Sequence, residues 1–167
     1  AVNNRKPVID KYITIGGDVP EDITIVAPMG MKIKDLLKAV GYGNLDGKAV
    51  VNGGPMMGKL VDLENDVVTK TTKGLLIFPI THGIVQRMKQ PIGVSMKRAS
   101  AACCNCTMCT DMCPRYLLGY NLEVHKTVRA ASHGEVKNTE AFLQNALCCG
   151  CGICSVIACQ QGLFPSK

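Results

Sequence analysis

Tryptophan is absent from this sequence of 167 residues, and its aromatic rings are four tyrosines and three phenylalanines. So few rings leave little to stack on bases, and the lysines and arginines are scattered, so the net charge of +6 does not indicate nucleic-acid binding. Long apolar runs are also missing. The longest, residues 75–80, contains a proline and is far shorter than the roughly 20 residues that span a bilayer. We expect no nucleic-acid partner and no direct membrane span.

The beginning of the sequence lacks two common features of a complete chain. It has no initiator methionine, and residues 1–7 are polar and basic, without the apolar segment of a signal peptide. We therefore expect that this sequence is a fragment of a longer protein and that it does not open with a signal peptide.

Cysteine is missing from residues 1–102, whereas all ten cysteines fall between residues 103 and 159. A secreted disulfide scaffold would spread its bridges through the fold and would rarely place cysteines so close together. Metal or cluster ligation in a reducing cytosol fits this placement better, so we expect a cytoplasmic protein. No Ser/His/Asp or Cys/His arrangement is visible, and we predict no catalytic residue.

The cysteine-free part predicts a small mixed α/β unit. Short runs of alternating or continuous apolar residues favour strands, and apolar residues at i, i+3, i+4 and i+7 favour one amphipathic helix. The order strand, strand, helix, strand, strand is that of a β-grasp domain, which we assign to residues 1–100, with residues 81–100 as an irregular basic connection. Strands are predicted at residues 12–15, 23–27, 49–51 and 75–78, and the helix at 33–40.

The cysteine-rich part, residues 101–167, predicts a helical domain. Apolar residues recur at helical spacing from Leu117 to Ala131. Ser132 followed by Glu135 has the form of a capping box for a next helix, which would run to the second group of cysteines. On one side that helix would carry Val136, Leu143 and Leu147.

The first cysteine run has the spacing C-x2-C-x2-C-x3-C-P, the ferredoxin-type pattern for [4Fe–4S] clusters. Two-residue gaps let a tight loop wrap a cubane, so that three thiolates reach three irons. The longer step before the proline turns the chain away, and the fourth thiolate then points towards a second cluster. The cysteines of this run are Cys103, Cys106, Cys109 and Cys113.

The second run has the spacing C-x2-C-x2-C-x4-C, with glutamine in place of the proline. Glycines at positions 150 and 152 suit a loop whose backbone must approach an inorganic core closely. The cysteines of this run are Cys148, Cys151, Cys154 and Cys159.

Together the two runs predict a ferredoxin-like dicluster domain with two [4Fe–4S] clusters as cofactors. The ferredoxin pattern implies crossed ligation between the runs, although the spacing alone also permits uncrossed sites. Crossed ligation gives one cluster to Cys103, Cys106, Cys109 and Cys159, and the other to Cys148, Cys151, Cys154 and Cys113.

Zinc is the structural alternative, because four-cysteine sites built from C-x2-C pairs are common, although such sites usually draw their pairs from separated knuckles. Cys104 and Cys149 each follow the first ligand of a run, and we interpret both as small buried apolar residues. The alternative is that one of them replaces its neighbour as a ligand. His82, His125 and His133 share no metal spacing, so we expect surface or capping roles.

Several segments resemble the cobalamin reductases of propanediol-utilisation microcompartments, a family that is in turn similar to the C subunit of the Rnf electron-transport complex. The upstream segments look like the soluble-ligand-binding β-grasp (SLBB) domain that both families share. The four-residue gap before the last cysteine of the second run favours the microcompartment type. The Rnf subunit resembles the pattern C-x2-C-x2-C-x3-C-P in both runs, with a three-residue gap. The segments that carry the resemblance are residues 109–120, 125–126 and 154–165, with 17–19, 31–41 and 51–58 upstream.

The resemblance implies an oxidoreductase. Flavoproteins of this kind carry FMN, oxidise NADH in an amino-terminal domain and pass single electrons through the clusters to an acceptor, here a corrinoid or a corrinoid-dependent enzyme. This chain has no Gly-rich flavin or dinucleotide motif at its start, so we expect FMN and NADH on a partner domain outside it. The fragment itself is then an electron carrier, and a bacterial microcompartment is its implied location within the cytoplasm.

Two other functions stay open. The chain could be the corresponding part of a membrane-associated Rnf-type complex, with the same chemistry and a different partner. It could also be a structural docking module whose clusters are redox-silent.

Overall fold

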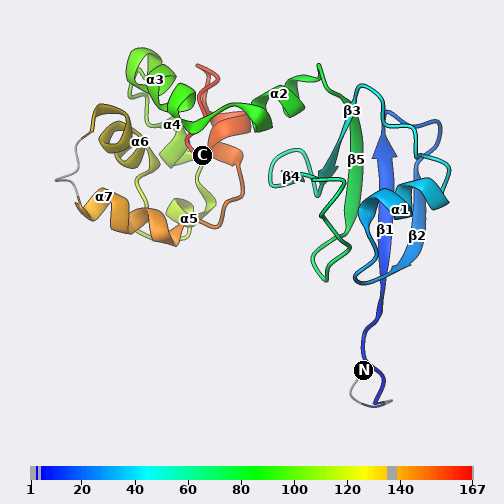
Figure 1. The fold of residues 1–167 in the computed structure, drawn as a ribbon. Coiled ribbons are helices and arrows are strands. Elements are labelled where there is room, and N and C mark those ends of the chain that lie inside the picture. Colours follow the sequence, from blue (N-terminus) through cyan, green and yellow to red (C-terminus); the bar gives the residue numbers. More distant parts are fainter. Residues whose placement is uncertain (1–2, 4, 135–138, 167) are drawn as a thin grey trace. The chain divides into compact units, whose positions relative to one another are not determined.

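The computed structural model describes residues 3, 5–134 and 139–166, and the chain divides into two compact units, Ala1–Lys89 and Gln90–Lys167 (Figure 1). The boundary expected at residue 100 falls inside helix α3 (Ile92–Ala102). This helix contacts α6 (Val124–His133) of the second unit, so the structural division comes before α3.

The first unit is built on a five-stranded mixed sheet with the order β2-β1-β5-β3-β4. The central strand β5 runs parallel to its neighbour β1, while β2 pairs antiparallel with β1, and β3 pairs antiparallel with both β5 and β4. All four predicted strands are present, whereas β4 was not predicted because it has only two residues. The strands are β1 (Asp10–Gly17), β2 (Ile23–Pro28), β3 (Lys48–Asn52), β4 (Lys59–Leu60) and β5 (Gly74–Pro79).

Helix α1 (Ile33–Ala39) lies against one face of this sheet (Figure 1). Its apolar side is the one predicted from the sequence, and Ile33, Leu36 and Leu37 are buried in the core. Burial of aliphatic side chains between a helix and a sheet is the main stabilising contribution in a unit of this size. The other buried core members are Ile13, Ile15, Ala27, Val50, Val68, Leu75 and Ile77.

The expectation of an irregular connection over residues 81–100 is wrong. This stretch contains helix α2 (Gly83–Lys89) and most of α3. The buried side of α3 consists of small residues, Ser95 and Ala99, while larger apolar residues such as Ile92 are exposed. Hydrophobic periodicity is therefore weak in the sequence although the helix is present.

The second unit consists of short helices, as predicted. The predicted continuous helix from Leu117 to Ala131 is wrong, because helix α5 (Pro114–Leu117) ends at Leu117 and α6 begins only at Val124. Gly119 lies in the gap, and a glycine disfavours a helix interior by about 1 kcal/mol relative to alanine. The remaining elements are α4 (Met108–Asp111), α5 (Pro114–Leu117), α7 (Thr139–Gln144), the 3₁₀ turn η1 (Asn145–Leu147) and the π-helical turn η2 (Cys154–Ala158).

Ser132 does not start a helix as predicted. It lies inside α6, and its hydroxyl donates a hydrogen bond to the carbonyl of Arg129 at 3.2 Å. Its expected capping partner Glu135, together with Val136, lies outside the described residues. The next described helix is α7, in which Leu143 is largely exposed. None of the helices in the described part of the chain is long and apolar enough to cross a membrane.

Candidate metal centres

One open cavity of the second unit gathers cysteines from both runs. The residues that lead into α4 provide one wall, and the end of η2 provides another. We call this the first cavity. Its cysteine lining is Cys103, Cys104, Cys106, Cys109 and Cys159.

A second open cavity lies beside the start of α5 and the loop that precedes η2, and we call it the second cavity. Cys113, at the N-terminus of α5, is the one cysteine of the first run in its lining. The other cysteines of this lining are Cys148, Cys149, Cys151 and Cys154.

Each cavity thus combines three regularly spaced cysteines of one run with the last cysteine of the other run. Crossed ligation requires this grouping, whereas uncrossed ligation would require Cys113 in the first cavity and Cys159 in the second. The two cavities are also neighbours, because Cys109 of the first and Cys154 of the second pack against the same small apolar cluster around Cys113.

The loops that carry the cysteines repeat one backbone conformation. Asn105 and Thr107 in the first loop have φ of 54° and 63°, and Gly150 and Gly152 at the corresponding positions have φ of 66° and 77°. A left-handed residue in a tight turn directs neighbouring N–H groups to one side, which makes a concave site for a negatively charged group. The repeat supports the correspondence of the two runs.

The unequal final gaps are accommodated by two kinds of helical turn. Between Cys109 and Cys113 the chain forms the end of α4 and one further residue. Between Cys154 and Cys159 it forms the π-helical turn η2 instead. A π turn holds one more residue than an α turn and is often found at functional sites. The extra residue therefore does not prevent Cys159 from reaching the first cavity.

Burial disfavours ionisation of two thiols at the cavities. Burial raises the pKa of Cys109 from 9.0 to about 11, and the nearby thiols of Cys154, Cys103 and Cys106 act in the same direction. Burial also raises the pKa of Cys154 to about 11, with three thiols of the second cavity adding to the effect. Crowded, partly buried thiols become stable thiolates only beside positive charge, so this donor set fits a cationic metal core.

No group of three or more His, Cys, Asp or Glu side chains gathers around a single-ion position in residues 3, 5–134 and 139–166. The regularly spaced cysteines line the walls of the two cavities, four to each.

The prediction that Cys104 and Cys149 are buried is wrong, because both are exposed at the cavities. A backbone hydrogen bond at Cys151 lowers the pKa of Cys149, and the Arg115 guanidinium contributes in the same direction. Arg115 lines the second cavity, and its guanidinium carbon lies 5.1 Å from the centre of the Tyr120 ring.

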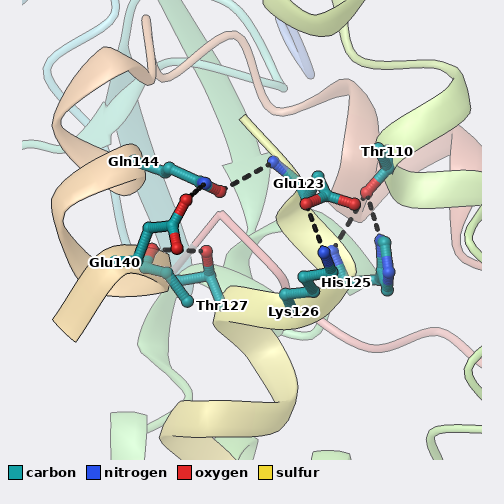
Figure 2. Close-up of polar contacts among 8 residues, drawn as sticks. Thr110, Glu123, His125, Lys126, Thr127, Glu140 and Gln144 are labelled. Atoms are coloured by element: carbon teal, nitrogen blue, oxygen red, sulfur yellow. Dashed lines mark hydrogen bonds and ion pairs between the residues drawn. The ribbon is translucent and has the colours of Figure 1, made fainter. Parts of the chain in front are cut away.

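His125 lines the first cavity, a location that the sequence did not predict. Its Nδ1 lies 2.8 Å from the hydroxyl of Thr110, the residue after Cys109 (Figure 2). The start of α6 is held in place around it, since Glu123 pairs with Lys126 and donates its backbone N–H to the side-chain oxygen of Gln144 at 3.4 Å. The adjacency of His125 and Thr110 arises from tertiary packing of α4 on α6, so spacing along the chain carries no signal for it.

Comparison with known proteins agrees with the cysteine pattern. Residues 102–164 match the model of the 4Fe-4S dicluster domain family. The whole chain is 36% identical to cobalamin reductase PduS of Salmonella typhimurium and 35% identical to that of Citrobacter freundii. Over 119 residues, 71% of its length, it is 30% identical to the C subunit of the ion-translocating oxidoreductase complex of Methanosarcina acetivorans, where it covers 24% of the relative.

The predicted resemblance to cobalamin reductases is therefore confirmed along the full length of this chain, and the resemblance to the C subunit of the ion-translocating complex is confirmed at lower identity. The chain spans 37% of the length of the two cobalamin reductases. The α+β class and an electron-transfer role of the dicluster part are supported by the same matches.

Proposed function

We propose that this chain is an electron-transfer module that binds two [4Fe–4S] clusters. The observation that carries the proposal is the division of eight regularly spaced cysteines between two neighbouring cavities, four to each. When bound, each cluster supplies one-electron redox chemistry within a range of potentials set by charge, hydrogen bonds and burial.

In this proposal the ligation is crossed. The chain's own contribution is to hold the thiolates in place through left-handed loop residues, and to bury most of them at least in part. The first cavity uses Cys103, Cys106, Cys109 and Cys159, and the second uses Cys113, Cys148, Cys151 and Cys154.

We further propose that the full-length protein is an NADH-dependent flavoprotein of the cobalamin reductase type. FMN and NADH would bind a domain outside these residues, and a corrinoid or corrinoid-dependent enzyme would accept the electrons. The support is the identity over the whole chain to proteins of that name, together with the portion of those proteins that this chain does not cover. Inside the cytoplasm, a bacterial microcompartment is the proposed location.

For the first unit we propose a β-grasp fold of the soluble-ligand-binding type. Its support is the mixed sheet with parallel β1 and β5 at the centre and α1 packed on one face. A place in an Rnf-type complex is the second candidate, favoured by the similarity to the C subunit of the ion-translocating complex, a match that covers less of this chain at lower identity.

The decisive experiment is iron and sulfide analysis of the chain purified without oxygen, followed by EPR of the reduced protein. About eight irons and eight sulfides per chain, with the signals of two interacting clusters, are expected. Protein that binds zinc without sulfide would overturn the proposal. Clusters that no reductant can reduce would instead support the structural docking module. Cys104→Ser serves as a control, because it removes a cavity cysteine that is not a proposed ligand. Its iron and sulfide content should equal that of the unsubstituted chain.

A further inference from the structure

The two cavities are alike in their cysteines and unlike in their charge. In each case the last cysteine of a run is followed by two residues that line the same cavity as that cysteine. Pro114 and Arg115 follow Cys113 in the second cavity, whereas Gln160 and Gln161 follow Cys159 in the first. Arg115 and Gln161 therefore occupy corresponding positions, one with a permanent positive charge and the other neutral.

Among the described residues that line the two cavities, no other Lys, Arg, Asp or Glu offsets the charge of Arg115. The first cavity is lined by no Lys, Arg, Asp or Glu, and Arg115 is the one such residue at the second. The first cavity also has His125 in its lining, where Nδ1 of the ring contacts the hydroxyl of Thr110 at 2.8 Å.

The position of Arg115 is well defined. The side chain is half-buried, it lines the second cavity, and its guanidinium carbon lies over the Tyr120 ring, 5.1 Å from the ring centre. An arginine remains protonated at any pH at which the protein is folded, so the charge is permanent. Partial burial also limits its screening by salt.

A negative charge lies beside the loop of the first cysteine run, which lines the first cavity. The hydroxyl of Thr107 donates a hydrogen bond of 2.9 Å to the carboxylate of Asp111, two residues after Cys109. The residue two positions after Cys154 is Val156, which carries no charge. Asp111 is exposed, so its effect is smaller than that of Arg115, but it acts in the same direction.

We infer that Arg115 gives the cluster of the second cavity a higher reduction potential than the cluster of the first cavity. A single added electron then resides on the second cluster in preference to the first. This inference rests on the proposed function. The added electron carries one unit of negative charge, and no bond forms or breaks when it passes from one site to the other. A fixed cation stabilises the reduced form beside it, whereas a neutral glutamine at the corresponding position does not.

The test is an EPR-monitored redox titration of three variants of the intact chain with both clusters present. Arg115→Gln is expected to lower the higher of the two midpoint potentials, changing that site's reduction equilibrium about tenfold, or about 59 mV for one electron. Gln161→Arg is expected to raise the lower potential by a similar amount. Arg115→Lys keeps the charge and should retain most of the original difference.

The direction of each change identifies the cavity concerned. If Arg115→Gln lowers the lower potential, or Gln161→Arg raises the higher one, the order of the two sites is the reverse of the one inferred. Unchanged potentials in both variants would also overturn the inference. The exposed Arg129, outside both linings, provides the control variant Arg129→Gln, which should leave both potentials unchanged.

Failure of the proposed function gives a different result. A chain with fewer than two clusters, or with clusters that cannot be reduced, has no pair of potentials to compare. If both clusters are reducible but their midpoint potentials do not change when Arg115 is substituted, the electron-transfer function stands. Only the role of Arg115 is then refuted.

Discussion

The hydroxyl of Thr110 makes two hydrogen bonds to one residue, His125, across the interface between α4 and α6 (Figure 2). It accepts the backbone N–H of His125 at 3.1 Å and lies 2.8 Å from Nδ1 of the ring. Thr110 is almost fully buried, and these two contacts with His125 provide partners for its hydroxyl in the described part of the chain.

Thr110→Val is expected to destabilise the second unit by about 1–3 kcal/mol. Valine has the shape of threonine but leaves the backbone N–H of His125 and its Nδ1 without their partner. Thr110→Ser keeps the hydroxyl and should be the milder change. Urea unfolding of the cluster-loaded protein without oxygen measures both, and equal stability of the two variants would contradict the double hydrogen bond.

Gly150 provides a test of the loop conformation. A side chain at this position has free space, since nothing lies within 4 Å of an added Cβ, but the φ of +66° is strained for most residues. Gly150→Asn should be tolerated, as asparagine already occupies the corresponding position 105. Gly150→Val should cost about 1–2 kcal/mol more, because branched side chains fit the left-handed conformation poorly. Thermal unfolding compares the pair, and a valine variant as stable as the asparagine variant would count against the loop geometry.

Raised thiol pKa values give the cluster-free protein a characteristic pH dependence. Cys109 and Cys154 have pKa values of about 11 in the folded chain against 9.0 as the reference, so the folded state binds their protons more tightly. Their contribution to stability is complete below about pH 9 and is lost as the pH rises through about 11. The thermal midpoint of the cluster-free chain should fall over this range.

The same measurement on Cys154→Ser serves as the control. Serine does not ionise in this range, so the decline attributable to residue 154 should disappear. A cluster-free wild-type protein whose stability is unchanged from pH 9 to 11 would contradict the crowding of thiols.

Crossed ligation predicts which pairs of substitutions act on one cluster. Cys113→Ser combined with Cys148→Ser removes two ligands of the same proposed cluster, so about four irons should remain. Cys113→Ser combined with Cys103→Ser damages both clusters, and almost no iron should remain. Uncrossed ligation predicts the opposite ranking, so iron analysis of the two double variants decides between them.

Local patterns in the sequence predicted most of the first unit. Alternation of apolar residues located β1, β2, β3 and β5, and the spacing of Ile33, Leu36 and Leu37 located α1, because these elements bury one regular face. Helix α3 was missed since its buried face consists of Ser95 and Ala99, which carry little hydrophobic signal.

The candidate ligands could be predicted from the spacing of the cysteines in the sequence, because a short loop around a cluster must place its thiolates at fixed intervals. What spacing could not provide was the set of residues brought beside the ligands by packing. Thr110 and His125 are 15 residues apart, and Arg115 meets the second run only in the folded unit. Such contacts depend on how helices pack, which local patterns do not specify.

The π-helical turn η2 shows how a motif of this kind can tolerate a change in length. Because the turn absorbs one residue between Cys154 and Cys159, the gain or loss of a single codon there converts one gap length into the other. The exposed Ile157 in this turn is a residue whose deletion would leave an α-type turn and a three-residue gap. A search for one fixed interval would overlook the second run of this chain, although its last cysteine lines the first cavity.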